Sequence, residues 1–325
     1  MARIRVAAPC KINLHLSVGE RRADGYHNLE SIFQTLDFGD SLDFEILEEK
    51  GRCDILTHTL PGAVFQLPPE ENIVFKAVSV FRRYTGFDRG VRVLLEKRVP
   101  AGGGLGGGSS DAAAALAALD LLAGTCLSLA ELRDMALSLG SDVPFFLADP
   151  PSGRGGEPWV SQAGSGGAAW VSGRGERIVP LESPPWPALL VSPGFSSPTG
   201  EAFRRLDLWR AGGNRGGDFN GGGTLNPAEL IEAFSGDPAA WPYWNDFLPA
   251  LGGGNGDFSV YRRILSTLRG GGAAFAGLSG AGSACFGVFK DKGGVERAAK
   301  LLLNEGFLVY VTFFLARSPF RVLNC

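Results

Sequence analysis

The sequence feature that most constrains the fold is a glycine run at residues 102–108, broken by Leu105 and followed at once by two serines and an alanine-rich stretch. A strand-like alternation at residues 91–96 precedes it, and residues 109–123 are strong helix formers. This order predicts a bare loop leading into a helix N-terminus, where unpaired N–H groups and the helix dipole favour an anion. Because glycine adopts positive φ and has no Cβ, several amides can converge on one phosphate. The run therefore predicts a phosphate-binding loop.

Three alternatives compete with this interpretation. Gly102, Gly104 and Gly107 satisfy G-x-G-x-x-G, but a dinucleotide site needs an acidic residue about 20 positions later, after a second strand. Asp120 has that spacing and lies inside a helical run, and no lysine follows the glycines as a P-loop requires. The chain has 47 glycines in 325 residues, and its other glycine runs are typical of flexible loops. The flanking strand and helix patterns set residues 102–108 apart, so we expect a phosphate loop of a third kind.

Composition and charge limit which binding partners and which cellular compartment we expect for this chain. With 45% hydrophobic and 20% charged residues, the chain is globular and long enough for two domains. The chain has 31 Lys and Arg and 34 Asp and Glu, so it has no surplus of positive charge for binding a nucleic acid. Five cysteines without a C-x-x-C pattern suit a reducing compartment, and no segment has the pattern of a signal peptide or membrane span, so we expect a cytoplasmic protein. Three histidines without H-E-x-x-H argue against a protein-built zinc site.

The N-terminal segment alternates as a β-strand does. Between residues 4 and 18, apolar side chains share one side of the strand, whereas Lys11, Asn13 and His15 share the other. The polar side either faces water, which is the more frequent case in antiparallel sheets, or presents a lysine and an asparagine together to a site.

Turn signals place three more candidate residues. The Asp-Gly pair at residues 24–25 predicts a tight turn, which puts Tyr26 and His27 just beyond the first strand. A helix predicted over residues 128–139 by its capping box is followed closely by Asp142, just before a proline. From spacing alone, Asp142 is more typical of a local turn than of a placed catalytic carboxylate.

Glycine-rich runs and a proline cluster mark the organisation of the chain. Residues 150–176 and 211–226 are rich in Gly, Pro and Ser, and we expect surface loops with little structure of their own. Prolines gather around residues 181–186 and indicate the change of domain. The prediction is an N-terminal domain over residues 1–180 and a C-terminal domain over residues 181–325.

The C-terminal domain has the pattern of a β-α-β unit. Strands at residues 286–289 and 308–314 flank a helix at residues 295–305. A second glycine loop, at residues 277–283, precedes this unit.

Five motifs together resemble the GHMP kinases, the small-molecule kinases named for galactose, homoserine, mevalonate and phosphomevalonate. Residues 9–14 resemble the family's first motif, and residues 22–27 its substrate loop. Residues 100–113 resemble its ATP loop, residues 139–146 its acidic segment and residues 278–283 its third motif. The resemblance implies an α+β fold of two domains, the first like ribosomal protein S5 domain 2 and the second a ferredoxin-like βαβ domain, with ATP and substrate in the cleft between them.

The resemblance implies an ATP site around the glycine loop. The loop amides would hold the phosphates, Ser109 or Ser110 would ligate Mg²⁺, and Asn72 and Lys97 would lie near the adenine. Asn72 is equally typical of an N-cap, for a helix over residues 72–84, and Lys97 of a solvated lysine. The implied ATP-binding residues are Asn72, Lys97, Pro100, Gly102, Gly103, Gly104, Leu105, Gly106, Gly107, Gly108, Ser109 and Ser110.

The resemblance also implies the catalytic pair. Asp142 would take the proton from the acceptor hydroxyl, and Lys11 would stabilise the resulting charge and the γ-phosphate. Because phosphoryl transfer needs mainly positioning and charge stabilisation, so few polar groups suffice. The resemblance thus reverses the interpretations that spacing alone favoured for Asp142 and for the polar side of the first strand.

Within the family, the resemblance is to the branch that phosphorylates the 2-hydroxyl of a cytidine diphosphate derivative of methylerythritol, in the non-mevalonate isoprenoid pathway. Tyr26 and Phe203 would sandwich the pyrimidine, His27 would hydrogen-bond its edge, and Phe33 would line the pocket or belong to the core. The implied substrate-binding residues are Asn13, Tyr26, His27, Phe33, Thr199, Phe203, Gly280 and Gly282. We expect a monomer or a weak homodimer.

Two other functions are open to such a chain. A kinase of the same fold could act on a sugar, homoserine or mevalonate, but such enzymes have no reason to share the turn at residues 24–27. A nucleotide-binding regulator without catalysis would need neither Lys11 nor Asp142.

Overall fold

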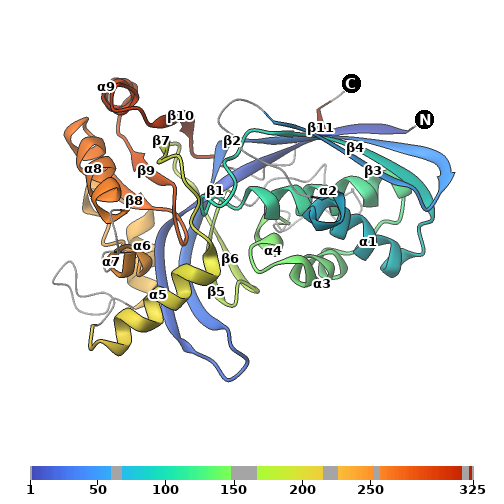
Figure 1. The fold of residues 1–325 in the computed structure, drawn as a ribbon, viewed down its shortest axis with the longest axis horizontal. Helices are drawn as coiled ribbons and strands as arrows, with labels where there is room; N and C mark the ends of the chain where they lie inside the picture. The colour runs from blue at the N-terminus through green and yellow to red at the C-terminus, as the bar shows by residue number, and fades with distance from the viewer. Residues whose placement is uncertain are drawn as a thin grey trace.

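The computed structural model describes residues 2–59, 68–147, 167–214, 226–251, 257–316 and 322–323. These residues form a larger part, built mostly from the N-terminal half, and a smaller part built mostly from the C-terminal half (Figure 1). Two long strands, β1 (Arg3–Arg21) and β2 (His27–Lys50), run from the larger part to the smaller one. Together they form the common frame of the molecule.

The larger part is, over the described residues, a seven-stranded sheet with helices on one face. The strand order is β11-β1-β2-β4-β3, and β5 and β6 extend the sheet from the first half of β2. Its other elements are β3 (Cys53–Thr59), β4 (Arg89–Lys97), β5 (Ala168–Gly173), β6 (Arg177–Leu181), β11 (Val322–Leu323), the 3₁₀ helix Pro69–Glu71, α1 (Ile73–Thr85), α2 (Gly107–Ala123), α3 (Leu129–Leu139) and α4 (Val143–Phe146).

Period-two alternation determines which side of this sheet is buried. Leu42, Phe44 and Ile46 of β2, which alternate with polar residues, point into the core. Residues 110–120 of α2 are buried all round, because alanine side chains let this central helix lie close to its neighbours. The predicted capping box, Ser128 with Glu131, is present at the start of α3.

The smaller part is a four-stranded antiparallel sheet in the order β10-β7-β9-β8. The predicted β-α-β unit is β9-α9-β10, and β7 lies between its two strands. The elements of this part are β7 (Pro187–Ser192), α5 (Thr199–Ala211), α6 (Pro227–Phe234), the 3₁₀ helix Pro238–Ala240, α7 (Phe247–Ala250), α8 (Asp257–Gly270), β8 (Phe275–Leu278), β9 (Cys285–Val288), α9 (Lys292–Asn304) and β10 (Leu308–Phe313).

One glycine-rich run contains a strand that the sequence analysis missed. Residues 168–173 form β5, which pairs with β2 from Leu29 to Gln34, so the prediction of surface loop throughout residues 150–176 is wrong at this end. Four consecutive apolar side chains of this strand, at residues 168–171, are buried in the fold, which local composition could not indicate. The earlier part of that run, and residues 215–225 of the second run, lie outside the described residues.

The polar side of β1 does not face water. Lys11, Asn13 and His15 are each at most 3% exposed, so the water-facing alternative is wrong. The His15 ring lies edge-on to Trp244, 4.2 Å between ring centres, and burial lowers its pKa to about 3, which keeps the ring neutral. Segments distant in the sequence cover this side of the strand, and those that cover Lys11 and Asn13 form the site described below.

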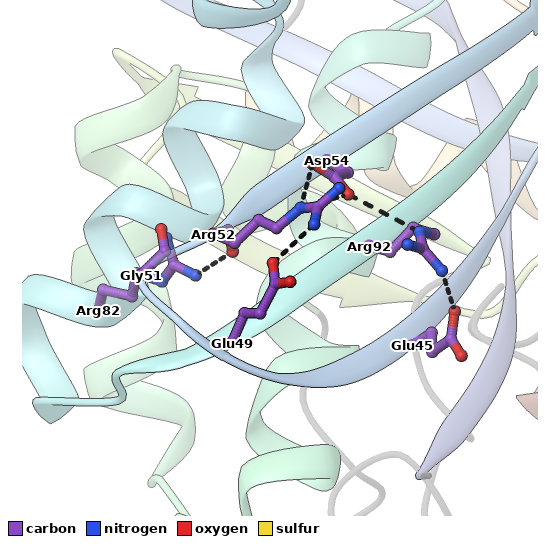
Figure 2. Close-up of polar contacts among 7 residues, drawn as sticks. All are labelled: Glu45, Glu49, Gly51, Arg52, Asp54, Arg82 and Arg92. Carbon is purple, nitrogen blue, oxygen red and sulfur yellow. Dashed lines mark hydrogen bonds and ion pairs between the residues drawn. The ribbon is translucent and has the colours of Figure 1, made fainter.

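An exposed polar network joins the edge of the larger sheet to α1, as Figure 2 shows. Arg82 of α1 donates to the carbonyl oxygens of Gly51 and Arg52 at 2.9 and 2.7 Å. Each exposed ion pair stabilises the fold little, but charges along the edge strand β3 discourage pairing with another sheet. The network comprises Glu45, Glu49, Gly51, Arg52, Asp54, Arg82 and Arg92.

Candidate active site

The glycine loop ends at the N-terminus of α2, as predicted. Gly106 is the N-cap residue with φ of 67°, and no side chain caps the helix, so its first N–H groups are left for a ligand. Gly102 and Gly104 also have positive φ, of 67° and 72°, which glycine adopts without strain. Leu105 is buried, and its carbonyl oxygen accepts a hydrogen bond from Lys11 N at 2.9 Å. The loop is a bare backbone cradle at a helix N-terminus, which favours phosphate.

The cradle packs against the second glycine segment. Ser279 Oγ donates to Gly104 O at 2.8 Å, and Ala284 N donates to Gly103 O at 3.0 Å. A Cβ at Gly280 would lie 3.1 Å from Gly104 O. The structure therefore brings together Gly104 and Gly280, which the sequence analysis assigned to ATP and to the acceptor.

Gly104→Ala is expected to weaken ATP binding about 5-fold to 150-fold, because the substitution strains the loop by about 1–3 kcal/mol. A Cβ at Gly104 would lie 2.2 Å from Ser279 O, and its φ of +72° is unfavourable for alanine. Titration with a non-hydrolysable ATP analogue measures the effect. Gly124→Ala is the matched control, since φ there is +65° but a Cβ meets open space. Equal losses of affinity in the two variants would contradict the role of the cradle.

Lys11 of β1 directs its ammonium group toward the cradle. Nζ donates to Asn13 Oδ1 at 2.6 Å and to Gly104 O at 3.2 Å. Nζ also lies 4.6 Å from the centre of the Phe33 ring, a cation–π distance. A Cβ at Gly106 would lie 3.0 Å from Lys11 Cγ, and φ there is +67°, so glycine at residue 106 lets the loop lie against this side chain without strain. Phe33 is thus both a core residue and a support for Lys11.

The Asp142 side chain points toward Lys11 from the start of α4. Asp142 Oδ2 lies 3.3 Å from Lys11 Nζ, and the Asp142 side chain is 31% exposed. Asp142 occupies the N-cap position of α4, but its carboxylate makes no capping hydrogen bond. The backbone therefore forms the turn that spacing alone favoured, while the carboxylate points to the cation and can accept a proton from a bound hydroxyl.

Asn13 links the two sides of the site. Its Nδ2 donates to Ser31 Oγ at 2.9 Å, which leaves Oδ1 for Lys11. The backbone N–H of Asn13 donates to Ser279 Oγ at 3.3 Å. Sequence reasoning missed Ser31 and Ser279 as site residues, although Ser279 lies within the third motif at residues 278–283.

Lys97, at the end of β4, is buried in a cluster of charges, so the solvated-lysine alternative is wrong. Its Nζ donates to the Asp40 carboxylate of β2 and to Asp111 Oδ2 of α2, the latter at 2.8 Å. Asp40 also accepts hydrogen bonds from the backbone N–H groups of Arg98 and Val99, at 2.5 and 2.8 Å. The cluster therefore ties both ends of the glycine loop together.

Other ATP-site candidates surround the loop. The Asn72 side chain caps α1 through a 3.0 Å hydrogen bond, so the capping alternative is confirmed, while its place near the adenine stays a prediction. The neighbouring Ile73 lies 3.7 Å from the Cβ position of Gly108. Ser109 is half-buried, whereas Ser110 is fully buried and its Oγ has no hydrogen-bond partner.

The residues predicted to hold a pyrimidine lie at the β1–β2 hairpin and on α5. Tyr26 is 50% exposed, and the Phe203 ring stacks on His27 with 5.0 Å between ring centres. His27 Nδ1 lies 3.0 Å from Gly19 O, and Nε2 lies 3.5 Å from Asp207 Oδ1. Because both ring nitrogens have partners, a hydrogen bond from this ring to a cytosine stays a prediction.

Among the described residues, no group of three or more His, Cys, Asp or Glu side chains lies close enough together to hold a metal ion. Over the same residues, every helix is too short or too polar to cross a bilayer.

The chain is similar in sequence to two family models and to known kinases. The family model described as GHMP kinases N terminal domain matches residues 72–149, and the model described as GHMP kinases C terminal matches residues 258–306. A 4-diphosphocytidyl-2-C-methyl-D-erythritol kinase of Treponema pallidum (strain Nichols) is 38% identical over 94% of this chain and 96% of its own length. Its counterpart from Anaeromyxobacter dehalogenans (strain 2CP-C) is also 38% identical, over 98% of this chain and 92% of its own.

Solved structures confirm the predicted fold. The crystal structure of a 4-(cytidine 5'-diphospho)-2C-methyl-D-erythritol kinase matches with a TM-score of 0.71 and 31% identity, over 95% of this chain and 98% of that one. A homoserine kinase from Cytophaga hutchinsonii matches with a TM-score of 0.68 and 17% identity, over 99% and 98% of the two chains, and so supports the fold alone. With these relatives above 30% identity over nearly its whole length, the chain belongs to the family of 4-diphosphocytidyl-2-C-methyl-D-erythritol kinases, within the GHMP kinases.

Proposed function

We propose that this protein transfers the γ-phosphoryl group of ATP to the 2-hydroxyl of 4-diphosphocytidyl-2-C-methyl-D-erythritol, a step of the non-mevalonate isoprenoid pathway. One observation carries the proposal: the Lys11 ammonium group lies 3.2 Å from the carbonyl oxygen of Gly104 in the phosphate cradle and 3.3 Å from the Asp142 carboxylate. A cation and a base therefore meet beside a site for phosphate, as phosphoryl transfer to an alcohol requires.

The chemistry follows from this arrangement. Asp142 takes the proton of the 2-hydroxyl while the hydroxyl oxygen attacks the γ-phosphorus. The bond from the γ-phosphorus to the β–γ bridging oxygen breaks, and ADP leaves. Lys11 and the amides at the start of α2 stabilise the charge on the transferred group. Because Asn13 and Phe33 hold Lys11 in place, this stabilisation requires little rearrangement.

The serine hydroxyls at the start of α2 fit a Mg²⁺ ion that binds together with ATP. Mg²⁺ usually keeps phosphate oxygens and waters as most of its ligands, so the protein needs to supply few. The hydroxyl of Ser109 or Ser110 would supply one, and the buried Ser110 Oγ has no other hydrogen-bond partner. The ion would offset the charge of the phosphates.

The acceptor would lie between the β1–β2 hairpin and α5. Tyr26 and Phe203 provide aromatic surfaces for the pyrimidine, and Thr199 is exposed at the start of α5. Gly280 and Gly282 have positive φ and bring backbone to this side of the cradle.

The domain boundary that we propose, near residue 181, falls between β6 of the larger sheet and β7 of the smaller sheet.

A comparison of two acceptors tests the proposal. With ATP, the diphosphocytidyl substrate is expected to give a kcat/KM about 5-fold to 150-fold higher than free methylerythritol phosphate, because stacking of a base on aromatic side chains contributes about 1–3 kcal/mol. A coupled assay of ADP release measures both. Equal kcat/KM values would contradict the assignment of Tyr26 and Phe203, and turnover of neither acceptor would contradict the proposed function.

A further inference from the structure

The turn between β5 and β6, at residues 174–176, reaches the Tyr26 ring. Arg174 Cζ lies 3.7 Å from the centre of that ring, well within cation–π distance. Tyr26 is 50% exposed, so part of its side chain stays accessible although Arg174 lies over the ring. The guanidinium group covers one face of the ring and leaves the other face for a ligand.

The same turn touches the segment that carries Asp142. A Cβ at Gly175 would lie only 2.3 Å from Ser141 O, and φ of Gly175 is +119°. Only glycine permits this close approach of two backbones. Ser141 directly precedes Asp142, so the position of the turn and the position of the proposed base are linked.

The turn itself is well fixed. Arg174 N donates to Glu176 Oε2 at 2.6 Å, and Gly175 N donates to Ser172 O at 3.3 Å. The paired strands β5 and β6 hold the turn on both sides, and β5 is anchored to β2. A turn held in this way can orient both of the groups that it contacts.

We propose that the β5–β6 turn positions the acceptor substrate: Arg174 holds the Tyr26 ring for stacking on the pyrimidine, and Gly175 sets the place of the Asp142 segment. This inference rests on the proposed function. Arg174 acts through Tyr26 and is therefore a positioning residue. Orienting an exposed aromatic ring before the ligand binds lowers the entropy lost on binding.

Arg174→Met tests the contact with Tyr26. In the full chain it is expected to raise KM for the diphosphocytidyl substrate about threefold to tenfold, while kcat and the KM for ATP change less than about twofold. Arg177→Met is the matched control, because Arg177 is exposed on the same hairpin and its loss removes the same charge. An unchanged substrate KM in Arg174→Met would overturn the inference.

A double variant separates action through Tyr26 from direct contact with the substrate. If Arg174 acts through the ring, adding Arg174→Met to Tyr26→Leu is expected to leave the KM of Tyr26→Leu unchanged within about twofold. Additive losses would overturn the inference. Turnover by the unaltered chain tests the proposed function separately, so the two failures are distinguishable.

Gly175→Ala tests the link to Asp142. It is expected to lower kcat at least about tenfold, because the added methyl group must displace the turn or the Ser141 backbone. Gly306→Ala is the matched control. Gly306 also has a positive φ, +87°, but a Cβ there meets open space, so kcat of this variant is expected to stay unchanged. Equal kcat values in the two variants would overturn the link, and equal ATP affinities would establish that both remain folded.

Discussion

Asp142→Asn is expected to lower kcat at least about 100-fold, and up to about 10⁴-fold, the range over which general bases contribute to catalysis. The asparagine keeps the size and the turn of Asp142 but cannot accept the proton of the 2-hydroxyl. The α4 N-cap has no hydrogen bond from this side chain, so the substitution removes no cap. ATP binding is expected to persist, because the cradle is built from backbone amides at the start of α2. Single-turnover kinetics and titration with an ATP analogue measure the two properties independently.

Asp134→Asn is the matched control for this experiment. Asp134 is exposed on α3, and its substitution also removes one negative charge. Its kcat is expected to stay within about twofold of the unaltered chain, as for most surface substitutions. An active Asp142→Asn enzyme would refute the assignment of the base, whereas a loss of ATP binding would place Asp142 in the nucleotide site instead.

The glycine loop and the first strand were predictable because their signals are local. The sequence of strand, glycines and alanine-rich helix specifies a cradle within residues 91–123. The alternation of β1 correctly placed Lys11 and Asn13 on one side. It could not reveal that this side is buried, because the segments that cover it, at residues 104, 142 and 279, are joined to it only by the fold.

Contacts between distant segments account for what the sequence analysis missed. Lys97 has the local pattern of a solvated residue, and its partner Asp40 precedes it by 57 positions on another strand. Residues 168–173 were hidden within a glycine-rich run, because their strand character depends on pairing with β2. Arg174 and Gly175 gain their significance from that pairing, which carries the turn to Tyr26 and Ser141.

The buried Lys97 cluster leads to the second large effect: Lys97→Met is expected to lower the free energy of unfolding by about 3–5 kcal/mol, the usual cost of leaving a buried charge without its partner. The Asp40 side chain is fully buried and accepts hydrogen bonds from two backbone N–H groups as well as from Lys97. Without the ammonium group, its negative charge stays in the core. Urea denaturation followed by circular dichroism measures the change.

Asp111→Asn is the matched control in the same cluster, and it is expected to change the free energy of unfolding at pH 7 by less than about 1 kcal/mol. Burial, opposed by Lys97 and reinforced by Asp40, raises the pKa of Asp111 to about 8, so at pH 7 this carboxyl is mostly protonated and resembles an amide. The folded state then holds a proton that the unfolded state releases near pH 4, so stability falls as the pH rises from about 4 to about 8. Asp111→Asn should lose that part of the pH dependence. A destabilisation as large as that of Lys97→Met would mean that Asp111 is ionised in the fold and that the cluster needs both negative charges.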